Sequence, residues 1–274
     1  MRRFDYFKGQ PSEFWAKVRF ISQELGYTKR RADAIRTYSV DEIVNLFLEN
    51  GDQIDIAEAE ELSKYSEMRC EAVHEARNYL MDAKQAEEVY AQVSKKISWA
   101  IVPFSAPMNK QKGGKRNVAF LTALVDLIAF DVLSDYGLEF DHDPRCLLEF
   151  YDLNHNLVSV SSRRLDGAFP STRNPEAVWE IKEYYYTTTF GSRIADGVYE
   201  TRLDGYELND AEEQTGRKTT HILFVDSYST WWEQGKSYFC RLIDMLNEGS
   251  VDEIIFGYEV LTRWPEVLRE IIES

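Results

Sequence analysis

The stretch AVWEIKEYYYTTTFGSR (residues 177–193) combines a strand-forming pattern with an acid and a base two positions apart. Residues i and i+2 of a β-strand project from the same face about 7 Å apart, so Glu180 and Lys182 are expected to point into one space. Trp179 and Ile181 alternate with them and are expected to face the other way. The stretch therefore predicts a strand with an ionic pair on one face and an apolar surface on the other.

A second acid precedes this strand, near the end of the strand-like run LVSVSSRRLDGAF (residues 157–169). Turn-forming Pro and Asn residues separate the two runs, which predicts an antiparallel hairpin. The hairpin would place Asp166 beside Glu180, so that two carboxylates and the Lys182 ammonium converge at one sheet edge. Carboxylate oxygens are preferred ligands of Mg²⁺, which also accepts phosphate oxygens. These groups predict metal-assisted phosphodiester hydrolysis, with the main-chain carbonyl of Ile181 as a further metal ligand.

The same residues also fit a structural interpretation. Glu180 and Lys182 would then form a surface salt bridge on an edge strand, and Asp166 would be a turn residue. The tripeptide formula alone is not specific, because Asp82-Ala83-Lys84 satisfies it within an acidic helical stretch. Positions i and i+2 of a helix do not share a face. The strand context and the preceding Asp166 therefore favour the catalytic interpretation.

Hydrophobic spacing indicates that the first third of the chain is helical. PSEFWAKVRFISQELGY (residues 11–27) and SVDEIVNLFLENG (39–51) predict two helices, the second opening with Ser39 and Glu42 in capping-box spacing. The connection between these helices is compatible with a helix-turn-helix that meets a phosphate backbone, or with plain helical packing. Residues 54–92 predict one or two further helices with a solvated, charged face.

We expect two regions, a helical one at 1–104 that recognises DNA or mediates dimerisation, and a core at 105–274. The core is expected to be mixed α/β (α+β), with a central mixed sheet flanked by helices. The predicted order of its elements is a helix over 117–136, strands over 145–153, 157–169 and 177–186, a helix over 192–204, a strand over 221–228, a helix over 235–249, a strand over 252–260 and a closing helix over 264–274.

Asp166 followed by Glu180-Ile181-Lys182, within three strand-like runs after an apolar helix, resembles the PD-(D/E)xK nuclease superfamily. Its best known members are type II restriction endonucleases, and the resemblance covers roughly residues 105–265. It implies a core of one helix, three antiparallel strands, a second helix and a further strand. It also implies cleavage of double-stranded DNA with Mg²⁺, for which Mn²⁺ can substitute. Asp166 and Glu180 would be the acidic metal ligands, and Lys182 the catalytic lysine.

Two positions depart from the pattern of that superfamily. Leu165 stands where many members have proline before the aspartate. Many members also carry an acid on the first core helix, which has no clear counterpart here. Asp126 on the helix and Glu149 on the first strand are the candidates for this additional acid.

Basic residues gather in a few segments, although the formal net charge of −15 would repel DNA from the molecule as a whole. Residues 1–36 hold nine Lys and Arg residues against four acids. Arg193, Asp196 and Glu200 follow the catalytic strand, and are expected either to approach the scissile phosphate or to be ordinary helix-surface charges. The residues proposed to bind DNA are Lys110, Lys112, Lys115, Arg116, Lys29, Arg30, Arg31 and Arg193.

Apolar runs and cysteines indicate where the chain is located and whether it forms disulfides. No apolar run is long enough to cross a bilayer and no secretory signal opens the sequence, so a cytoplasmic protein without a membrane partner is expected. Three dispersed cysteines argue against disulfides or a zinc site.

The leading hypothesis is a type II restriction endonuclease, acting as a homodimer because two strands are cut. The alternatives are a repair or phage-defence nuclease, and a catalytically silent DNA-binding module.

Overall fold

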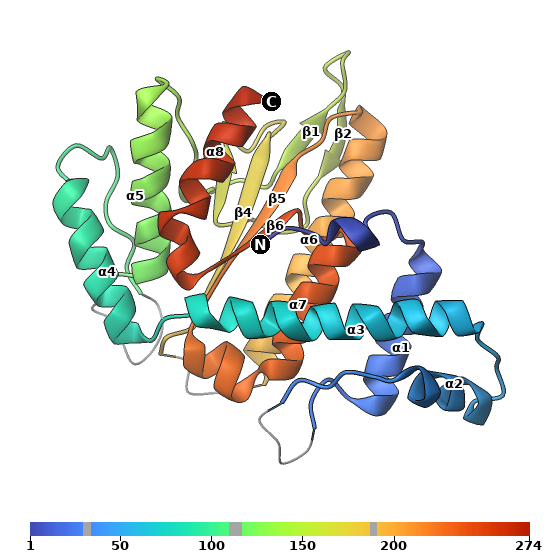
Figure 1. Ribbon diagram of the computed structural model, residues 1–274. Coiled ribbons are helices and arrows are strands. Elements are labelled where there is room, and N and C mark those ends of the chain that lie inside the picture. The colour runs from blue at the N-terminus through green and yellow to red at the C-terminus, as the bar shows by residue number, and fades with distance from the viewer. Residues whose placement is uncertain (30–33, 110–116, 187–190) are drawn as a thin grey trace.

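The computed structural model describes residues 1–29, 34–109, 117–186 and 191–274. A four-stranded sheet lies between two layers of helices, and a helical N-terminal region packs beside one of these layers (Figure 1). The sheet consists of β3 (Gly167–Phe169), β4 (Ala177–Glu183), β5 (Thr220–Asp226) and β6 (Glu253–Phe256). The mixed α/β class with a central sheet flanked by helices is thereby confirmed.

The strand order is β3-β4-β5-β6. Strand β3 runs antiparallel to β4, whereas β4, β5 and β6 are mutually parallel. Gly167 pairs with Trp179 in the β3–β4 ladder. A Cβ atom at Gly167 would lie 2.0 Å from the Trp179 indole, so this close approach requires glycine.

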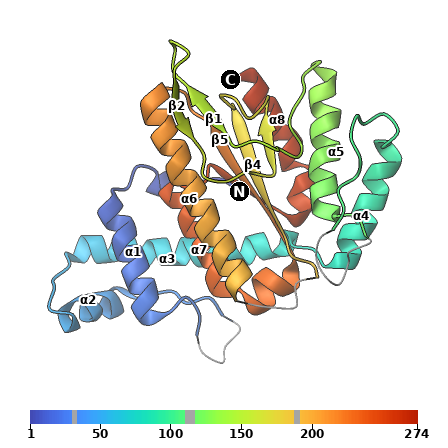
Figure 2. The same cartoon turned by 180° about the vertical axis from the view of Figure 1, so that it is seen from behind.

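The two faces of the sheet bury separate apolar clusters, each covered by helices. Trp179, Ile222 and Phe224 pack under α5 (Phe120–Asp135) and α8 (Arg263–Glu273), with α4 (Ala83–Lys96) beside α5 (Figure 1). Leu223 and Val225 pack under α6 (Ser192–Thr215) and α7 (Lys236–Glu248) on the opposite face, which is turned toward the viewer in Figure 2. Strands buried on both faces explain why β5 reads as a continuous apolar run.

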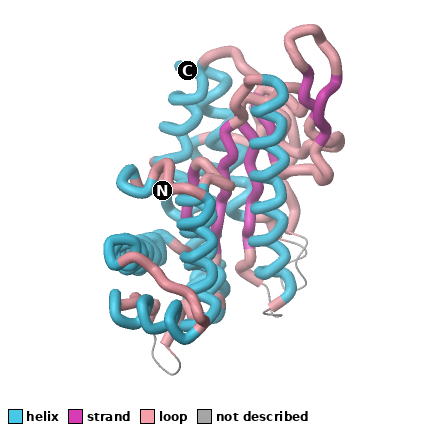
Figure 3. Tube along the Cα trace, turned by 90° about the vertical axis from the view of Figure 1, so that its right-hand side faces the viewer, coloured by secondary structure: helices cyan, strands magenta, loops and turns pink. Residues whose placement is uncertain are grey.

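The strand expected over residues 157–169 is wrong as a single element. Residues 157–160 form β2 (Leu157–Val160), which pairs only with β1 (Glu149–Tyr151) in a separate hairpin, and β3 starts at Gly167. After β2, Ser161 remains bonded to the segment before β1: its N–H donates to the Leu148 carbonyl at 3.0 Å, and its Oγ accepts the Leu148 N–H at 2.9 Å and donates to the Arg163 carbonyl at 2.8 Å. The β1–β2 hairpin projects beyond the main sheet (Figure 3), so the three-strand meander is not formed.

Most other elements lie where the sequence predicts them. The capping box of Ser39 and Glu42 is confirmed at the start of α2 (Val40–Glu49), and α6 continues to Thr215, beyond its expected end at residue 204. The strand expected over 252–260 ends at Phe256 and continues as a 3₁₀ turn. The remaining elements are α1 (Ser12–Leu25), α2 (Val40–Glu49), α3 (Ile56–Ala76), η1 (Asp5–Phe7), η2 (Arg77–Tyr79), η3 (Ser229–Gln234) and η4 (Gly257–Leu261).

The N-terminus is tied to the edge of the sheet. The Ile254 N–H donates to the Met1 carbonyl at 3.0 Å, and Arg2 forms an antiparallel bridge with Glu253. Within the described ranges, no helix is both long and apolar enough to cross a membrane.

Asp226 joins the segment after α3 to the end of β5. Its Oδ1 accepts the N–H groups of Met81 and Ser227, both at 2.7 Å, and its Oδ2 accepts the Tyr185 hydroxyl. The side chain is fully buried. Burial raises the pKa of Asp226 to about 8, although its hydrogen bonds act to lower it. The folded state therefore binds the proton more tightly than the unfolded chain.

We expect Asp226→Asn to flatten the pH dependence of the free energy of unfolding. The contribution of Asp226 is complete below the unfolded pKa of about 4 and is lost as the pH rises through about 8, at no more than about 1.4 kcal/mol per pH unit. Asparagine mimics the protonated acid, since its oxygen can accept both N–H groups and its amide can donate to Tyr185. Urea unfolding from pH 5 to pH 9 measures this slope, with exposed Asp131→Asn as the control. An unchanged slope in Asp226→Asn would contradict the assignment.

Candidate active site

Asp166 lies at the edge of β4, against the backbone of the Glu-Ile-Lys tripeptide. The pairing of Gly167 with Trp179 places Asp166 across from Glu180, and the Asp166 N–H donates to the Trp179 carbonyl at 3.1 Å. Asp166 Oδ2 accepts the Ile181 N–H at 2.8 Å. Because the N–H and C=O groups of one strand residue point to the same side, the Ile181 carbonyl faces this edge too. The predicted hairpin is confirmed, and it gathers these oxygens at one edge.

Glu180 and Lys182 share the face of β4 that α6 covers. Each is only 5% exposed, and Lys182 Nζ donates to Glu180 Oε1 at 2.5 Å. Arg163, which precedes β3, donates from Nη2 to the same oxygen at 2.8 Å. Glu180 Oε2 is buried and has no hydrogen-bond partner in the described part of the chain. One oxygen of this carboxylate thus carries two cations, and the other lacks a donor.

Two acids on α6 complete this ionic network. Glu200 Oε2 accepts from Lys182 Nζ at 3.2 Å, and Asp204 Oδ2 accepts from Arg163 Nη1 at 2.6 Å. Gly197 lets α6 lie close to β4, because a Cβ there would be 2.9 Å from the Tyr184 hydroxyl and 3.4 Å from Lys182 Cε. Sequence reasoning missed Arg163 and Asp204. The arginine pair before Asp166 was a usable signal, but nothing local indicates that Arg163 reaches α6.

The network keeps both members of the buried pair charged. Burial acts to lower the pKa of Lys182, but the charges of Glu180 and Tyr184 and the hydrogen bond to Glu180 together outweigh it and raise that pKa above its usual value. Burial acts in the opposite sense on Glu180, and Lys182 and Arg163 together lower its pKa below the usual range. Lys182 therefore carries an ammonium at neutral pH and is suited to stabilising negative charge rather than to accepting a proton.

Asp166 has a different electrostatic environment. Its side chain reaches solvent, but the protein packed around it removes much of the water within range of its charge. This desolvation and the nearby charge of Glu180 raise the pKa of Asp166 to about 7, while the Ile181 N–H acts to lower it. Two carboxylates that repel each other beside a main-chain carbonyl form an arrangement that a cation would stabilise.

A pocket of about 430 Å³ opens on the other face of β4, beside α5. Asp126, Asp166 and Glu183 all line it. Asp126 Oδ1 is buried without a hydrogen-bond partner among the described residues. Burial, followed by the charge of Asp166, raises the pKa of Asp126 well above its usual value. Glu183 accepts from the N–H and hydroxyl of Thr122, both at 3.1 Å, and so caps the first turn of α5.

The structure thus differs from the single open space expected for the charged groups. Glu180 and Lys182 are buried under α6, whereas the pocket lined by Asp166 lies on the α5 side. Of the two additional acids considered, Asp126 lies close enough to Asp166 for the charge of Asp166 to raise the pKa of Asp126. Glu149 instead lies on β1, where its carboxylate accepts the Tyr151 hydroxyl at 2.9 Å.

The basic residues proposed to bind DNA are described only in part. Lys110, Lys112, Lys115, Arg116, Arg30 and Arg31 lie outside the described residues, as does the side chain of Arg193 in the first turn of α6. Lys29 is exposed. Five other cations counted near the N-terminus pair with acids of the same chain, namely Arg2, Arg3, Lys17, Arg19 and Arg36. Most of the positive charge described in that region is therefore neutralised locally.

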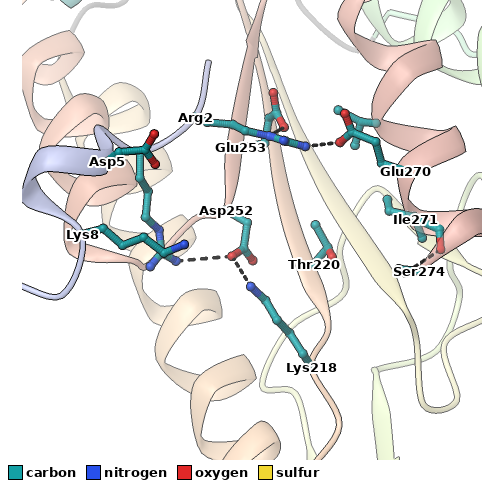
Figure 4. A pocket seen from close by; sticks show the side chains of 12 residues that line it. Arg2, Asp5, Lys8, Lys218, Thr220, Asp252, Glu253, Glu270, Ile271 and Ser274 are labelled. Carbon is teal, nitrogen blue, oxygen red and sulfur yellow. Dashed lines mark hydrogen bonds and ion pairs between the residues drawn. The ribbon is translucent and has the colours of Figure 1, made fainter.

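A second pocket, of about 420 Å³, lies where the N-terminus meets β6 and α8 (Figure 4). Arg2 binds Glu253 at 2.9 Å, and Lys218 binds Asp252 at 2.8 Å. Its lining carries four Lys and Arg side chains and four acids, so the opposite charges balance. This pocket has no excess of either sign, and its ion pairs hold the N-terminus in place.

A family model described as a domain of unknown function (DUF7687) matches residues 81–271. The chain belongs to the DUF7687 family. The DUF7687 domain contains Asp166, Glu180 and Lys182 as well as both acids of α6. Another model, described as a domain of unknown function (DUF7690), matches residues 1–76.

No curated protein and no solved structure matches the chain. The DUF7687 match begins at residue 81, before α4, and α4 packs with α5 in the same apolar cluster. The boundary near residue 105 stays a prediction.

Proposed function

We propose that the chain is a Mg²⁺-dependent nuclease that hydrolyses phosphodiester bonds of double-stranded DNA, with Asp166, Glu180 and Lys182 as its reactive groups. The observation that carries the proposal is the β3–β4 register, which sets Asp166 across from Glu180 and against the Ile181 N–H. The helix α6 and the further strand β5 after β4 also fit the later part of the order that the superfamily implies, although its three-strand antiparallel meander is not formed. A type II restriction endonuclease is the specific form proposed.

The metal would be held by Asp166, Glu180 and the Ile181 carbonyl. Within the described ranges, no three His, Cys, Asp or Glu side chains form a metal site by themselves. Mg²⁺ usually binds through one or two carboxylates and keeps several waters, so two acids and a carbonyl suit it better than a complete protein cage. The undonated Oε2 of Glu180 fits this role. Mn²⁺ has the same oxygen preference and is expected to substitute.

The bound metal would acidify an attacking water and neutralise the leaving oxygen. Lys182 is charged and fixed between Glu180 and Glu200, so its ammonium would stabilise the negative charge that develops on the phosphate. Because Glu180 and Lys182 are each 5% exposed, a phosphate must approach along the strand edge beside Asp166. Arg163 and Glu200 are the more exposed members of the network at that approach.

Burial of the ionic pair is the observation that favours a second function. If α6 remains closed over Glu180 and Lys182, the DUF7687 domain would bind DNA without cutting it. A repair or phage-defence nuclease would use the same reactive groups but would not produce discrete cuts. Cleavage of both strands by one site per chain would require a homodimer, which sedimentation can test.

We expect the purified chain to cleave supercoiled plasmid DNA in Mg²⁺ or Mn²⁺ and to stop when EDTA removes the metal. Discrete fragments would identify the restriction activity, and heterogeneous fragments the repair or defence activity. Metal-independent DNA binding without cleavage would support the silent module. A chain that neither cleaves nor binds duplex DNA would refute the proposed function.

A further inference from the structure

In the ionic network under α6, two acids of the helix contact the two cations that bind Glu180, and Glu200 lies near both of them, 3.8 Å from Arg163. Glu200 contacts Lys182 at 3.2 Å, and Asp204 contacts Arg163 at 2.6 Å. Residues four apart lie on one face of a helix, so both acids face the same strand. Helix α6 is thereby linked to Glu180 through two separate cations.

Arg163 is the point at which three segments meet. Its Nη2 binds Glu180 on β4 at 2.8 Å, and its Nη1 binds Asp204 on α6 at 2.6 Å, while its own backbone precedes β3. A guanidinium donates in a planar fork, so the two carboxylates that bind it fix its orientation. A lysine ammonium has no such plane and would be fixed less well. The fork also separates two buried acids that would otherwise repel each other.

The position of the Arg163 guanidinium decides which oxygen of Glu180 is available to bind a cation. Arg163 and Lys182 both donate to Oε1, and Oε2 has no donor in the part of the chain that the structure describes. A carboxylate free to rotate would exchange these two oxygens. With Arg163 held by Asp204, the same oxygen stays undonated.

We propose that Arg163, held by Asp204, is a positioning residue that sets the Glu180 carboxylate for cation binding. The inference rests on the proposed function, because it takes Glu180 as a metal ligand. Arg163 acts through Glu180, and Asp204 acts through Arg163. Residues that orient metal ligands in this way typically change metal affinity 10- to 100-fold when they are replaced.

Charge and orientation predict opposite results when Arg163 is replaced. Removing a positive charge near a cation site would by itself tighten cation binding. Losing the orientation of Glu180 would weaken it. We therefore expect Arg163→Gln to weaken Mn²⁺ binding about tenfold, measured by calorimetry on the full chain without DNA. Unchanged or tighter binding would overturn the proposal.

Two further variants separate the fork from its charge. Arg163→Lys keeps the charge but loses the fork, so it is also expected to bind Mn²⁺ more weakly than the wild type. Wild-type affinity in Arg163→Lys would show that charge alone matters and would overturn the proposal. Arg164→Gln is the matched control, since the neighbouring Arg164 is exposed, and it is expected to leave the affinity unchanged.

A structural readout keeps this inference distinct from the proposed function. In a crystal structure of Arg163→Gln, Glu180 is expected to lose its fixed conformation, whether or not the protein binds metal. A Glu180 carboxylate that keeps its place beside Lys182 would overturn the inference. If Arg163→Gln does not fold, Asp204→Asn serves instead, with the same expected loss of order at Glu180. If the wild type does not bind Mn²⁺ but Glu180 is displaced in the variant, the proposed nuclease function is contradicted. The positioning role of Arg163 is then still supported.

Discussion

Replacing Lys182 or Asp166 with alanine is expected to lower the rate of Mg²⁺-dependent DNA cleavage at least about a hundredfold, equivalent to roughly 2.7 kcal/mol of barrier. The Lys182 ammonium lies in a buried site, where a fixed charge stabilises a developing negative charge more strongly than it does in water. In the proposed site, Asp166 would supply an acidic ligand from outside the strand that carries Glu180. Initial rates of plasmid nicking at saturating Mg²⁺ measure both effects.

The chain contains a matched control for this experiment. Asp82-Ala83-Lys84 has the same tripeptide formula, but Asp82 caps α4 and Lys84 is 84% exposed. Lys84→Ala is therefore expected to cleave at the wild-type rate. Lys182→Met keeps most of the buried stem and separates loss of charge from loss of packing. Wild-type cleavage by either Asp166→Ala or Lys182→Ala would rule out this active site.

Local patterns predicted the parts of the fold that depend on local physics. The capping box at Ser39 and the alternation of Trp179 with Glu180 both follow from side chains within four positions, and the structure confirms them. The apolar run of β5 is likewise determined by burial on both faces. Alternation and apolar runs therefore sufficed to find β4, β5 and β6 and most of the helices that cover them.

Long-range polar contacts set what the patterns could not predict. Residues 157–169 read as one strand, but Ser161 bonds the backbone of Leu148 and Arg163 turns toward α6. These contacts hold residues 161–163 beside β1 and α6, outside the ladder of β3 with β4. The same limit applies to the site, because Arg163 and Asp204 are 41 positions apart and only the folded chain brings them together.

A buried ion pair connects the segment matched by DUF7690 to the DUF7687 domain. Arg69 on α3 is fully buried, and its Nη1 lies 3.2 Å from both carboxylate oxygens of Asp244 on α7. Tyr65 and Tyr27 donate their hydroxyls to Asp244 at 2.7 and 3.0 Å. The Arg69 guanidinium also donates to the Tyr38 hydroxyl at 3.2 Å. Side chains from two N-terminal segments, α3 and the segment after α1, thus converge on one acid of the core. A third segment, which carries Tyr38, contacts Arg69.

Arg69→Met is expected to lower the free energy of unfolding by about 3–5 kcal/mol, because it leaves the buried Asp244 carboxylate without its cation. Urea unfolding followed by tryptophan fluorescence measures this change. Arg69→Met combined with Asp244→Leu is expected to recover part of the loss, since replacing both partners with apolar groups removes the uncompensated charge. As a comparison, Lys84→Ala, which breaks the exposed pair with Glu88, is expected to lower the free energy of unfolding by less than about 0.5 kcal/mol.

The shape of the unfolding transition tests the same contact in a second way. Because Asp244 is held by Arg69, Tyr65 and Tyr27, the N-terminal helices and the sheet are expected to unfold together in the wild type. Arg69→Met weakens this link, so an early transition of the N-terminal helices is expected to separate from that of the sheet. A single transition with unchanged midpoint in Arg69→Met would show that the apolar contact of α3 with α7 holds the two parts together without the ion pair.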